Sequence, residues 1–234
     1  MTALEVMREL EGLGKDSLKK RYMNNGAREP LFGAATGAMK PLAKKTGKNQ
    51  VLAEELYATG NYDAMYFAGM IAEPNIMKEN DFNRWMDAAY FFMLSDFVVA
   101  VTLAEAAAAR PTAEKWLDSP RDLTASGGWS CWSWLVGWRP DTEFAVEIME
   151  ALLQRAREDI VSRNGRARIA IRNFMIAAGV SYKPLHDKAL ILAEEADALA
   201  LHYDDVTCFS GIAKAIRAEA EKGRVGFKRK SVRC

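Results

Sequence analysis

Six arginines lie within eighteen residues of the C-terminal half of the chain, a cluster that could bind successive phosphates of a nucleic acid. Only Glu158 and Asp159 interrupt it. Arg168 and Arg172 stand four residues apart and share one face of the predicted helix. The affinity of such a surface would fall steeply as salt rises. The alternative is a solvated helix face that neighbouring acids neutralise. The six residues are Arg155, Arg157, Arg163, Arg166, Arg168 and Arg172.

A second basic pattern lies near the N-terminus and would extend the same surface. Lys40, Lys44 and Lys48 repeat every four residues, and Lys45 stands beside them. No base-reading motif accompanies either cluster, so we expect contacts to phosphates and no sequence-specific regulation. The predicted phosphate-binding residues are Arg163, Arg166, Arg168, Arg172, Lys40, Lys44, Lys45 and Lys48.

Tryptophans gather in residues 129–138, which hold four of the six in the chain. Aromatic side chains at helical spacing usually fill a core, and this is the first interpretation. The alternative is that Trp132 offers a stacking surface to an unpaired or distorted base. Cys131, between two of the tryptophans, is expected to be a small buried side chain and not a nucleophile.

Charge is segregated along the chain, although the overall balance is only +1. Residues 1–50 carry a net charge of +5, residues 51–221 carry −10 and residues 222–234 carry +6. Such asymmetry favours a polyanionic partner. The last segment lacks periodicity and acidic residues, so we expect a mobile basic arm. The alternative is a tail that only aids solubility.

The elements that must position these residues are helices, because helical periodicity dominates the sequence and strand-like alternation is nearly absent. Thr2 and Glu5 form a capping box, and Asn61 is a helix cap. Prolines close helix pairs at spacings of 37, 29 and 44 residues. This cadence predicts an all-α fold, a curved solenoid of antiparallel helix pairs. A globular helical bundle is the alternative.

The predicted helices follow from caps, glycines and prolines. We expect them over residues 3–13, 36–46, 49–58, 62–72, 81–89, 95–109, 112–117, 127–138, 141–163, 165–180, 185–198 and 210–221. We assign residues 1–221 to a single repeat domain and residues 222–234 to the basic tail.

Composition excludes several classes of protein. A chain of 234 residues that is 50% hydrophobic is long enough for a sizeable core. No apolar stretch approaches the roughly 20 residues that cross a bilayer, and the N-terminus is not a signal peptide. Three widely spaced cysteines favour a reducing compartment, so we expect a cytoplasmic monomer. With two histidines and no glycine-rich phosphate loop, we expect neither a metal nor another cofactor.

Residues 32–74 carry an ordered set of motifs that is more specific than their periodicity. The set comprises Phe32-Gly33, the run from Met39 to Asn49, Leu52-Ala53, the run from Leu56 to Ala64, and finally Ala68, Ile71 and Pro74. It resembles the bacterial DNA alkylation repair family of HEAT-like repeats. Residues 166–179 and 204–208 also resemble one branch of that family, so the likeness covers most of the chain.

The resemblance implies stacked antiparallel helices with a basic face along double-stranded DNA, and its best-known members are glycosylases. In those enzymes a carboxylate with aromatic neighbours stabilises the cationic sugar while an alkylated purine is removed. The catalytic pattern of a Trp four residues before an Asp falls on Phe92 and Asp96. The Arg that should follow a Trp by three residues is replaced by Trp132, and a further expected Trp falls on Asn173.

Asp96 has a second interpretation. Ser95 and Asp96 open a predicted apolar helix, where serine is a good N-cap and an acid complements the helix dipole. The leading hypothesis is therefore a protein that binds damaged or distorted duplex DNA, with doubtful catalysis. The alternatives are an active glycosylase that excises N3- or N7-alkylated purines and a helical scaffold that binds other proteins.

Overall fold

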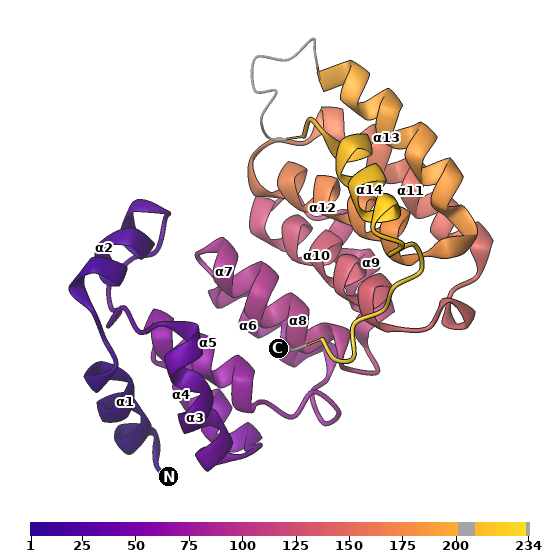
Figure 1. Ribbon diagram of the computed structural model, residues 1–234. Helices are drawn as coiled ribbons and strands as arrows, with labels where there is room; N and C mark the ends of the chain where they lie inside the picture. Colours follow the sequence, from indigo (N-terminus) through magenta and orange to yellow (C-terminus); the bar gives the residue numbers. More distant parts are fainter. Residues whose placement is uncertain (201–208, 233–234) are drawn as a thin grey trace. The chain divides into compact units, whose positions relative to one another are not determined.

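Helices form the regular structure of the residues that this computed structural model describes, 1–200 and 209–232 (Figure 1). These ranges contain no strand, and only Gly14 and Ala34 form an isolated antiparallel bridge. The predicted all-α class is confirmed. The chain divides into two compact units, Met1–Ala108 and Ala109–Cys234, which are described separately.

The N-terminal unit consists of short helices and one π-helical turn. They are α1 (Ala3–Gly12), α2 (Asp16–Asn24), α3 (Thr36–Thr46), α4 (Gln50–Ala58), α5 (Tyr62–Ile71), α6 (Glu79–Ala88), α7 (Phe92–Leu94), the π-helical turn η1 (Ser95–Val99) and α8 (Ala100–Ala104).

Local caps determine where several of these helices begin and end. The capping box is present: Glu5 N donates to Thr2 Oγ1 over 3.3 Å, and Thr2 N donates to Glu5 Oε2 over 2.9 Å. Asn61 Oδ1 accepts from the N–H groups of Asp63 and Ala64 in the first turn of α5. Gly47 ends α3 with a φ of 71°, a conformation that residues with a Cβ rarely adopt. These boundaries agree with the sequence-based predictions.

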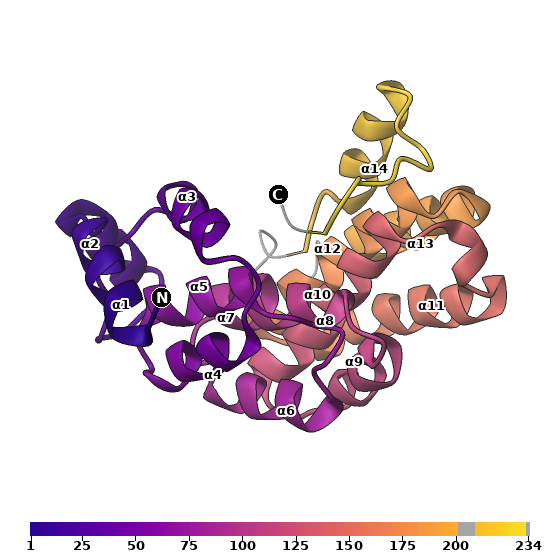
Figure 2. The ribbon, with the colours of Figure 1, turned by 90° about the horizontal axis from the view of Figure 1, so that it is seen from below.

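Helix α5 is the centre of the N-terminal unit. Every residue of α5 is buried except Tyr66 and Met70, which are half-buried. It contacts α1, α3, α4, α7 and η1. Figure 2 shows α4 and α6 on one side of α5 and α3 on the other. The half-buried Tyr66 and Met70, four residues apart, form a narrow stripe of α5 that is only partly covered.

A buried carboxylate fastens the loop before α3 to α5. Asp63 is fully buried and accepts three backbone N–H bonds, from Phe32 (2.6 Å), Gly33 (3.1 Å) and Ala34 (2.8 Å). Burial raises the pKa of Asp63, and the three N–H bonds oppose this rise. Without this carboxylate, three N–H groups of the loop would lose their acceptor. We call this arrangement the Asp63 clamp.

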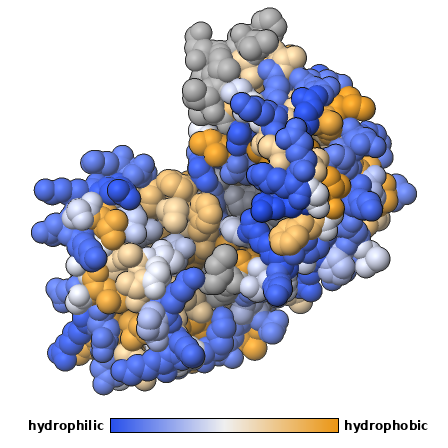
Figure 3. Space-filling model, viewed as in Figure 1, coloured by the Kyte–Doolittle hydropathy of each residue, from blue (hydrophilic) through white to orange (hydrophobic). Residues whose placement is uncertain are grey.

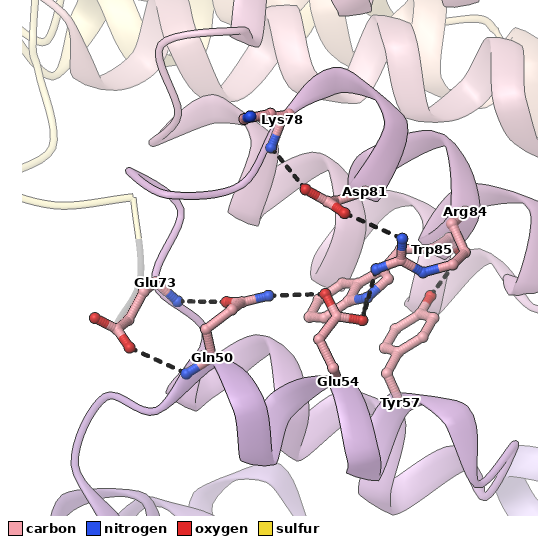
Figure 4. A network of polar contacts seen from close by, with 8 residues as sticks. All are labelled: Gln50, Glu54, Tyr57, Glu73, Lys78, Asp81, Arg84 and Trp85. Carbon is pink, nitrogen blue, oxygen red and sulfur yellow. Dashed lines mark hydrogen bonds and ion pairs between the residues drawn. The ribbon is translucent and has the colours of Figure 1, made fainter.

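A polar network joins the outer helices α4 and α6 (Figure 4). Glu54 Oε2 accepts from Arg84 Nη2 at 2.8 Å and from Trp85 Nε1 at 3.0 Å. Tyr57 stacks on Trp85 with ring centroids 4.1 Å apart and donates its hydroxyl to the carbonyl of Trp85. The two helices are thus held in register by side chains that neutralise one another.

The C-terminal unit contains the longer helices. They are α9 (Ala109–Leu117), α10 (Asp122–Trp138), the 3₁₀ turn η2 (Asp141–Glu143), α11 (Val146–Ser162), α12 (Gly165–Ser181), the 3₁₀ turn η3 (Lys183–Leu185), α13 (His186–Ala200) and α14 (Ile212–Glu221). Helix α10 contacts α9 and α12, and α12 also contacts α11, α13 and α14.

Carboxylates from neighbouring helices also cap two helices of this unit. Asp122 of α10 accepts from the backbone N–H groups of Arg166 and Ala167 at 2.9 and 2.8 Å. Asp197 of α13 does the same for the first two N–H groups of α14. The first N–H groups of α12 and α14 therefore bond to a carboxylate from elsewhere in the chain, because neither helix has a side-chain hydrogen bond from its own N-cap.

Several sequence-based boundaries were wrong, and one helix was missed. The helices predicted over 112–117 and 127–138 start earlier, at Ala109 and Asp122. The helix predicted over 95–109 starts at Phe92 as α7, contains the π-helical turn η1 and ends with α8 at Ala104. The helix predicted over 141–163 starts at Val146, after η2. Helix α2 was not predicted, because its polar segment contains no buried residue and shows no apolar face.

The predicted mobile basic arm is also wrong for the described part of the tail. Lys228 Nζ donates to the carbonyl of Val136 and pairs with Asp141, both at 2.7 Å. Arg229 lies over the ring of Trp134, and Val232 is buried. The tail packs because its cations find carbonyl, carboxylate and aromatic partners within the C-terminal unit. Cys234 lies outside the described residues, as does the predicted motif at 204–208.

None of the described helices is both long enough and apolar enough to cross a bilayer. Residues 201–208 and 233–234 were outside this search.

We predict that Asp63→Ala lowers the free energy of unfolding by about 3 kcal/mol or more, because three buried N–H groups lose a charged acceptor. Asp63→Asn should cost less, since the amide oxygen still accepts. Urea unfolding measures both. The matched control is Asp16→Ala in the first turn of α2, where we expect a loss of about 1 kcal/mol or less. Equal losses for Asp63→Ala and Asp16→Ala would contradict the clamp.

Candidate nucleic-acid interface

The lysines of α3 form an exposed basic surface on the N-terminal unit. Met39 and Leu42 are buried and turn one face of α3 towards the core, which leaves Lys40, Lys44 and Lys45 exposed. Lys44 and Lys45 lie in the last turn, where cations also complement the helix dipole. Contact of these lysines with phosphates remains a prediction. Their exposure leaves them accessible for such contact.

Lys48 continues this surface to the end of α5. Its Nζ donates to the carbonyl oxygen of Met70 at 3.2 Å, and the side chain is exposed. The last carbonyls of a helix lack partners within the helix, so a cation is stabilised there. Lys48 thereby brings positive charge to the half-buried stripe of α5. We call Lys40, Lys44, Lys45 and Lys48 the α3 lysines.

Asp96 lies within the π-helical turn and is only 1% exposed. Ser95 Oγ donates to Asp96 Oδ1 at 2.8 Å and also lies 3.3 Å from the carbonyl of Phe92. The expectation that Ser95 is an N-cap was wrong, since the helix starts at Phe92 and η1 follows without a break. The carboxylate is held in the interior and does not reach the surface.

Phe92 is half-buried and precedes this turn. Its ring meets Phe91 edge-on at 4.6 Å and lies 6.5 Å from the ring of Phe97. Phe92 and Asp96 are therefore close in sequence and in the fold, as the resemblance implied. Their proposed catalytic roles remain predictions.

Trp132 is buried at 1% exposure, so the expectation of a surface for base stacking was wrong. Its ring lies 6.4 Å from Phe144, and Trp129 packs against Phe174 at 5.1 Å. The core interpretation of this cluster holds for Trp129 and Trp132. Cys131 is also buried, and burial raises the pKa of its thiol well above the usual range, which keeps it from acting as a nucleophile.

Most of the predicted arginine strip binds the protein itself. Arg163 donates to the carbonyls of Leu117 and Ser119, both at 2.8 Å, at the end of α9. Arg168 is only 6% exposed, bonds to Asn164 and lies over the ring of Phe209. Arg172 Nε donates to the carbonyl of Ser210. Arg168 is therefore too buried to bind phosphates on the surface. Phosphate contacts by the half-buried Arg163 and Arg172 remain predictions.

The other arginines of the cluster have mixed surroundings. Arg155 pairs with Asp118 and Asp159, and Arg157 pairs with Glu195. Arg166 is half-buried, and the exposed Asn173 lies on α12. Phosphate or DNA contacts by Arg166 and Asn173 remain predictions.

A cavity of about 600 Å³ lies beside the network of α4 and α6. Arg28 stacks over the ring of Tyr90 at 4.3 Å, and Arg84 pairs with Glu54 and Asp81. Burial raises the pKa of Tyr90 to about 12. Because Arg84 pairs with Glu54 and Asp81, its charge is already neutralised by carboxylates of the same unit.

In the described part of the chain, no three His, Cys, Asp or Glu side chains gather to hold a metal ion.

Sequence reasoning missed the exposed aromatic residue of the π-helical turn. Phe97 is 36% exposed, although it lies within a strongly apolar run. A helical wheel of the predicted continuous helix would not find it, because the π-helical turn rotates the following residues. The acid at Asp122 was also missed as a cap, since it lies 44 residues from the N–H group of Arg166.

A scan against models of protein families matches residues 6–198 to the family described as DNA alkylation repair enzyme. Two uncharacterised Listeria proteins are similar over 206 residues, which are 86% of this chain and 88% of each relative. The protein of Listeria innocua serovar 6a is 29% identical, and that of Listeria monocytogenes serovar 1/2a is 27% identical.

A solved structure matches the chain over its full length. Its title is "A new family of proteins related to the HEAT-like repeat DNA glycosylases with affinity for branched DNA structures". The two chains are 48% identical, each is covered completely, and the TM-score is 0.91. This likeness covers both compact units, and it supports the HEAT-like arrangement of helix pairs.

We predict that Trp132→Ala lowers the free energy of unfolding by about 3 to 5 kcal/mol, because it leaves a large cavity in the core. Trp132→Phe should cost less. Thermal or urea unfolding followed by circular dichroism tests both variants. The matched control is Trp138→Ala, where the half-buried ring lies under Arg139 and a smaller loss is expected. A stable Trp132→Ala variant that binds DNA weakly would restore the stacking interpretation.

Proposed function

Because the chain belongs to the family of DNA alkylation repair enzymes, we propose that it binds branched or distorted DNA and does not excise alkylated bases. The main support is the solved structure of 48% identity and TM-score 0.91, whose title describes affinity for branched DNA. A similarity of this extent favours a shared partner. Damaged duplexes that expose unstacked bases belong to the same proposal.

The α3 lysines support binding to a polyanion. They are exposed on one helix and its following turn, and Lys48 neutralises the end of α5. Contacts of this kind fix a protein on the DNA backbone without reading a base sequence. The proposed binding therefore depends on DNA shape and charge.

The burial of Asp96 argues against excision. A glycosylase carboxylate must lie next to the sugar on which positive charge develops. Asp96 is 1% exposed and bonded to Ser95, and Trp132 occupies the position at which the family pattern has an arginine. The chemistry of the catalytic pattern is thus only partly retained.

An alkylpurine glycosylase is the second candidate, because the family description names enzymes and Asp96 is retained. In that case the π-helical turn would have to open so that Asp96 reaches the DNA. Asp96→Asn would then abolish release of free base while affinity for DNA stays the same.

One experiment separates these candidates. The protein is incubated with a four-way junction, with a duplex of the same length, and with a duplex that carries N3- and N7-methylpurines. Gel retardation reports affinity, and chromatography reports free base. We expect tighter binding to the junction and no release of base. Base release would establish the glycosylase, and no binding at low salt would favour a protein scaffold.

We also propose that the protein acts as a cytoplasmic monomer. The cytoplasmic location is supported by the odd number and wide spacing of Cys131, Cys208 and Cys234 in the sequence, which favours a reducing compartment. Sedimentation with and without DNA tests the oligomeric state.

We predict that Lys40→Glu combined with Lys44→Glu weakens binding to both junction and duplex and flattens the salt dependence, because fewer counterions are released. Each lost phosphate contact should reduce the slope of log affinity against log salt by about 0.9 on duplex DNA. Fluorescence anisotropy across a salt series measures this slope. The matched control is Lys78→Glu, an exposed lysine before α6, which lies on the other side of α5. Equal effects of the control and the double variant would contradict the α3 surface.

A further inference from the structure

The half-buried stripe of α5 lies beside the π-helical turn, which carries an exposed aromatic side chain. At Gly69 the two elements approach so closely that an added Cβ would lie 2.7 Å from Val98 Cγ1. Tyr66 is half-buried on α5, and Phe97 follows Asp96 on η1 with 36% of its surface exposed. Figure 3 shows hydrophobic side chains gathered over the region of α7. We define the aromatic patch as Tyr66, Phe92 and Phe97.

The patch is held by a buried aromatic layer. Phe91 is buried and contacts Phe92 edge-on at 4.6 Å and Tyr62 at 5.6 Å. Phe97 stands five residues after Phe92, which is the spacing of the i→i+5 hydrogen bond of a π-helix, and their rings are 6.5 Å apart. An aromatic ring fixed in this way loses little conformational freedom when a ligand stacks on it.

Positive charge borders the patch. Lys48 reaches the carbonyl of Met70, the other half-buried residue of the α5 stripe. Helix α3, with the exposed Lys40 and Lys44, also packs against α5. Aromatic side chains beside a basic surface are the combination that binds unpaired nucleotides, because the ring stacks on the base and the cations hold the backbone.

We propose that Phe97, supported by Phe92, stacks on a base that is left unstacked at the branch point of DNA, while the α3 lysines hold the adjoining phosphates. In a continuous duplex every base pair is covered on both faces, and exposing one costs a few kcal/mol. At a branch point that cost is already met. Phe97 therefore gives preference for branched over continuous DNA. This inference rests on the function proposed above and names the residue that provides its selectivity.

The test uses a junction with 2-aminopurine at the branch point and the same junction with 2-aminopurine within one arm. Stacking quenches this base, so wild-type protein should lower the fluorescence of the branch-point probe alone. Phe97→Ala should remove that quenching and weaken junction binding roughly tenfold or more. Affinity for continuous duplex should stay the same, because no unstacked base is present there. Phe97→Tyr should retain both signals.

Two further variants keep the test decisive. Val51→Ala removes an exposed apolar side chain from α4, on the other side of α5, and should change neither signal. Phe97→Leu retains an apolar side chain and removes the ring, so it replaces Phe97→Ala if that variant unfolds. Circular dichroism and the urea midpoint establish that each variant is folded.

The outcomes distinguish a failure of the proposed function from a failure of the stacking inference. If wild-type protein binds junction and duplex equally, the proposed function fails whatever the variants do. If it prefers the junction and Phe97→Ala and Phe97→Leu keep the same affinity and quenching, the stacking inference is overturned and the function stands. If Phe97→Ala instead abolishes self-association and leaves DNA binding intact, a second copy of the chain covers the patch and the inference is likewise overturned.

Discussion

Backbone N–H groups without a local acceptor are the constraint on which both units depend. A buried N–H group that loses its partner is costly, and the short connections of this chain leave several of them at helix starts and in loops. Asp63, Asp122 and Asp197 supply the missing oxygens from another helix. Each carboxylate fixes the position of one segment relative to another, so the apolar faces pack in a single register. The exposed lysines and the aromatic patch occupy the surface that this packing leaves open.

The helices could be predicted wherever their signals are local. Thr2 with Glu5 and Asn61 provide caps within three residues of the N–H groups that they bind, and these boundaries agree with the structure. The Asp63 clamp spans about thirty residues, so no local pattern indicates it. The π-helical turn was missed for a different reason: an apolar run such as that around Asp96 fits a regular helix equally well. Side-chain type alone also could not distinguish an arginine that binds DNA from Arg168, which is too buried to bind phosphates on the surface.

The family resemblance gave the fold more reliably than it gave the site. Helix pairing depends on many weak preferences, and the loss of a few motif residues leaves it intact. The chemistry depends on single positions, and here Trp132 is part of the core and Asp96 lies in the interior. Architecture and site chemistry can therefore diverge within one family, which is the premise of the proposed function.

The Asp63 clamp also bears on the order in which the chain folds. The N–H groups of residues 32–34 have their acceptor on α5, so the loop before α3 cannot be fully satisfied until residue 63 is present. During synthesis from the N-terminus, α1 to α3 emerge before the carboxylate that fastens them. We therefore expect the loop before α3 to become ordered only together with α5 and not as part of an independent early unit.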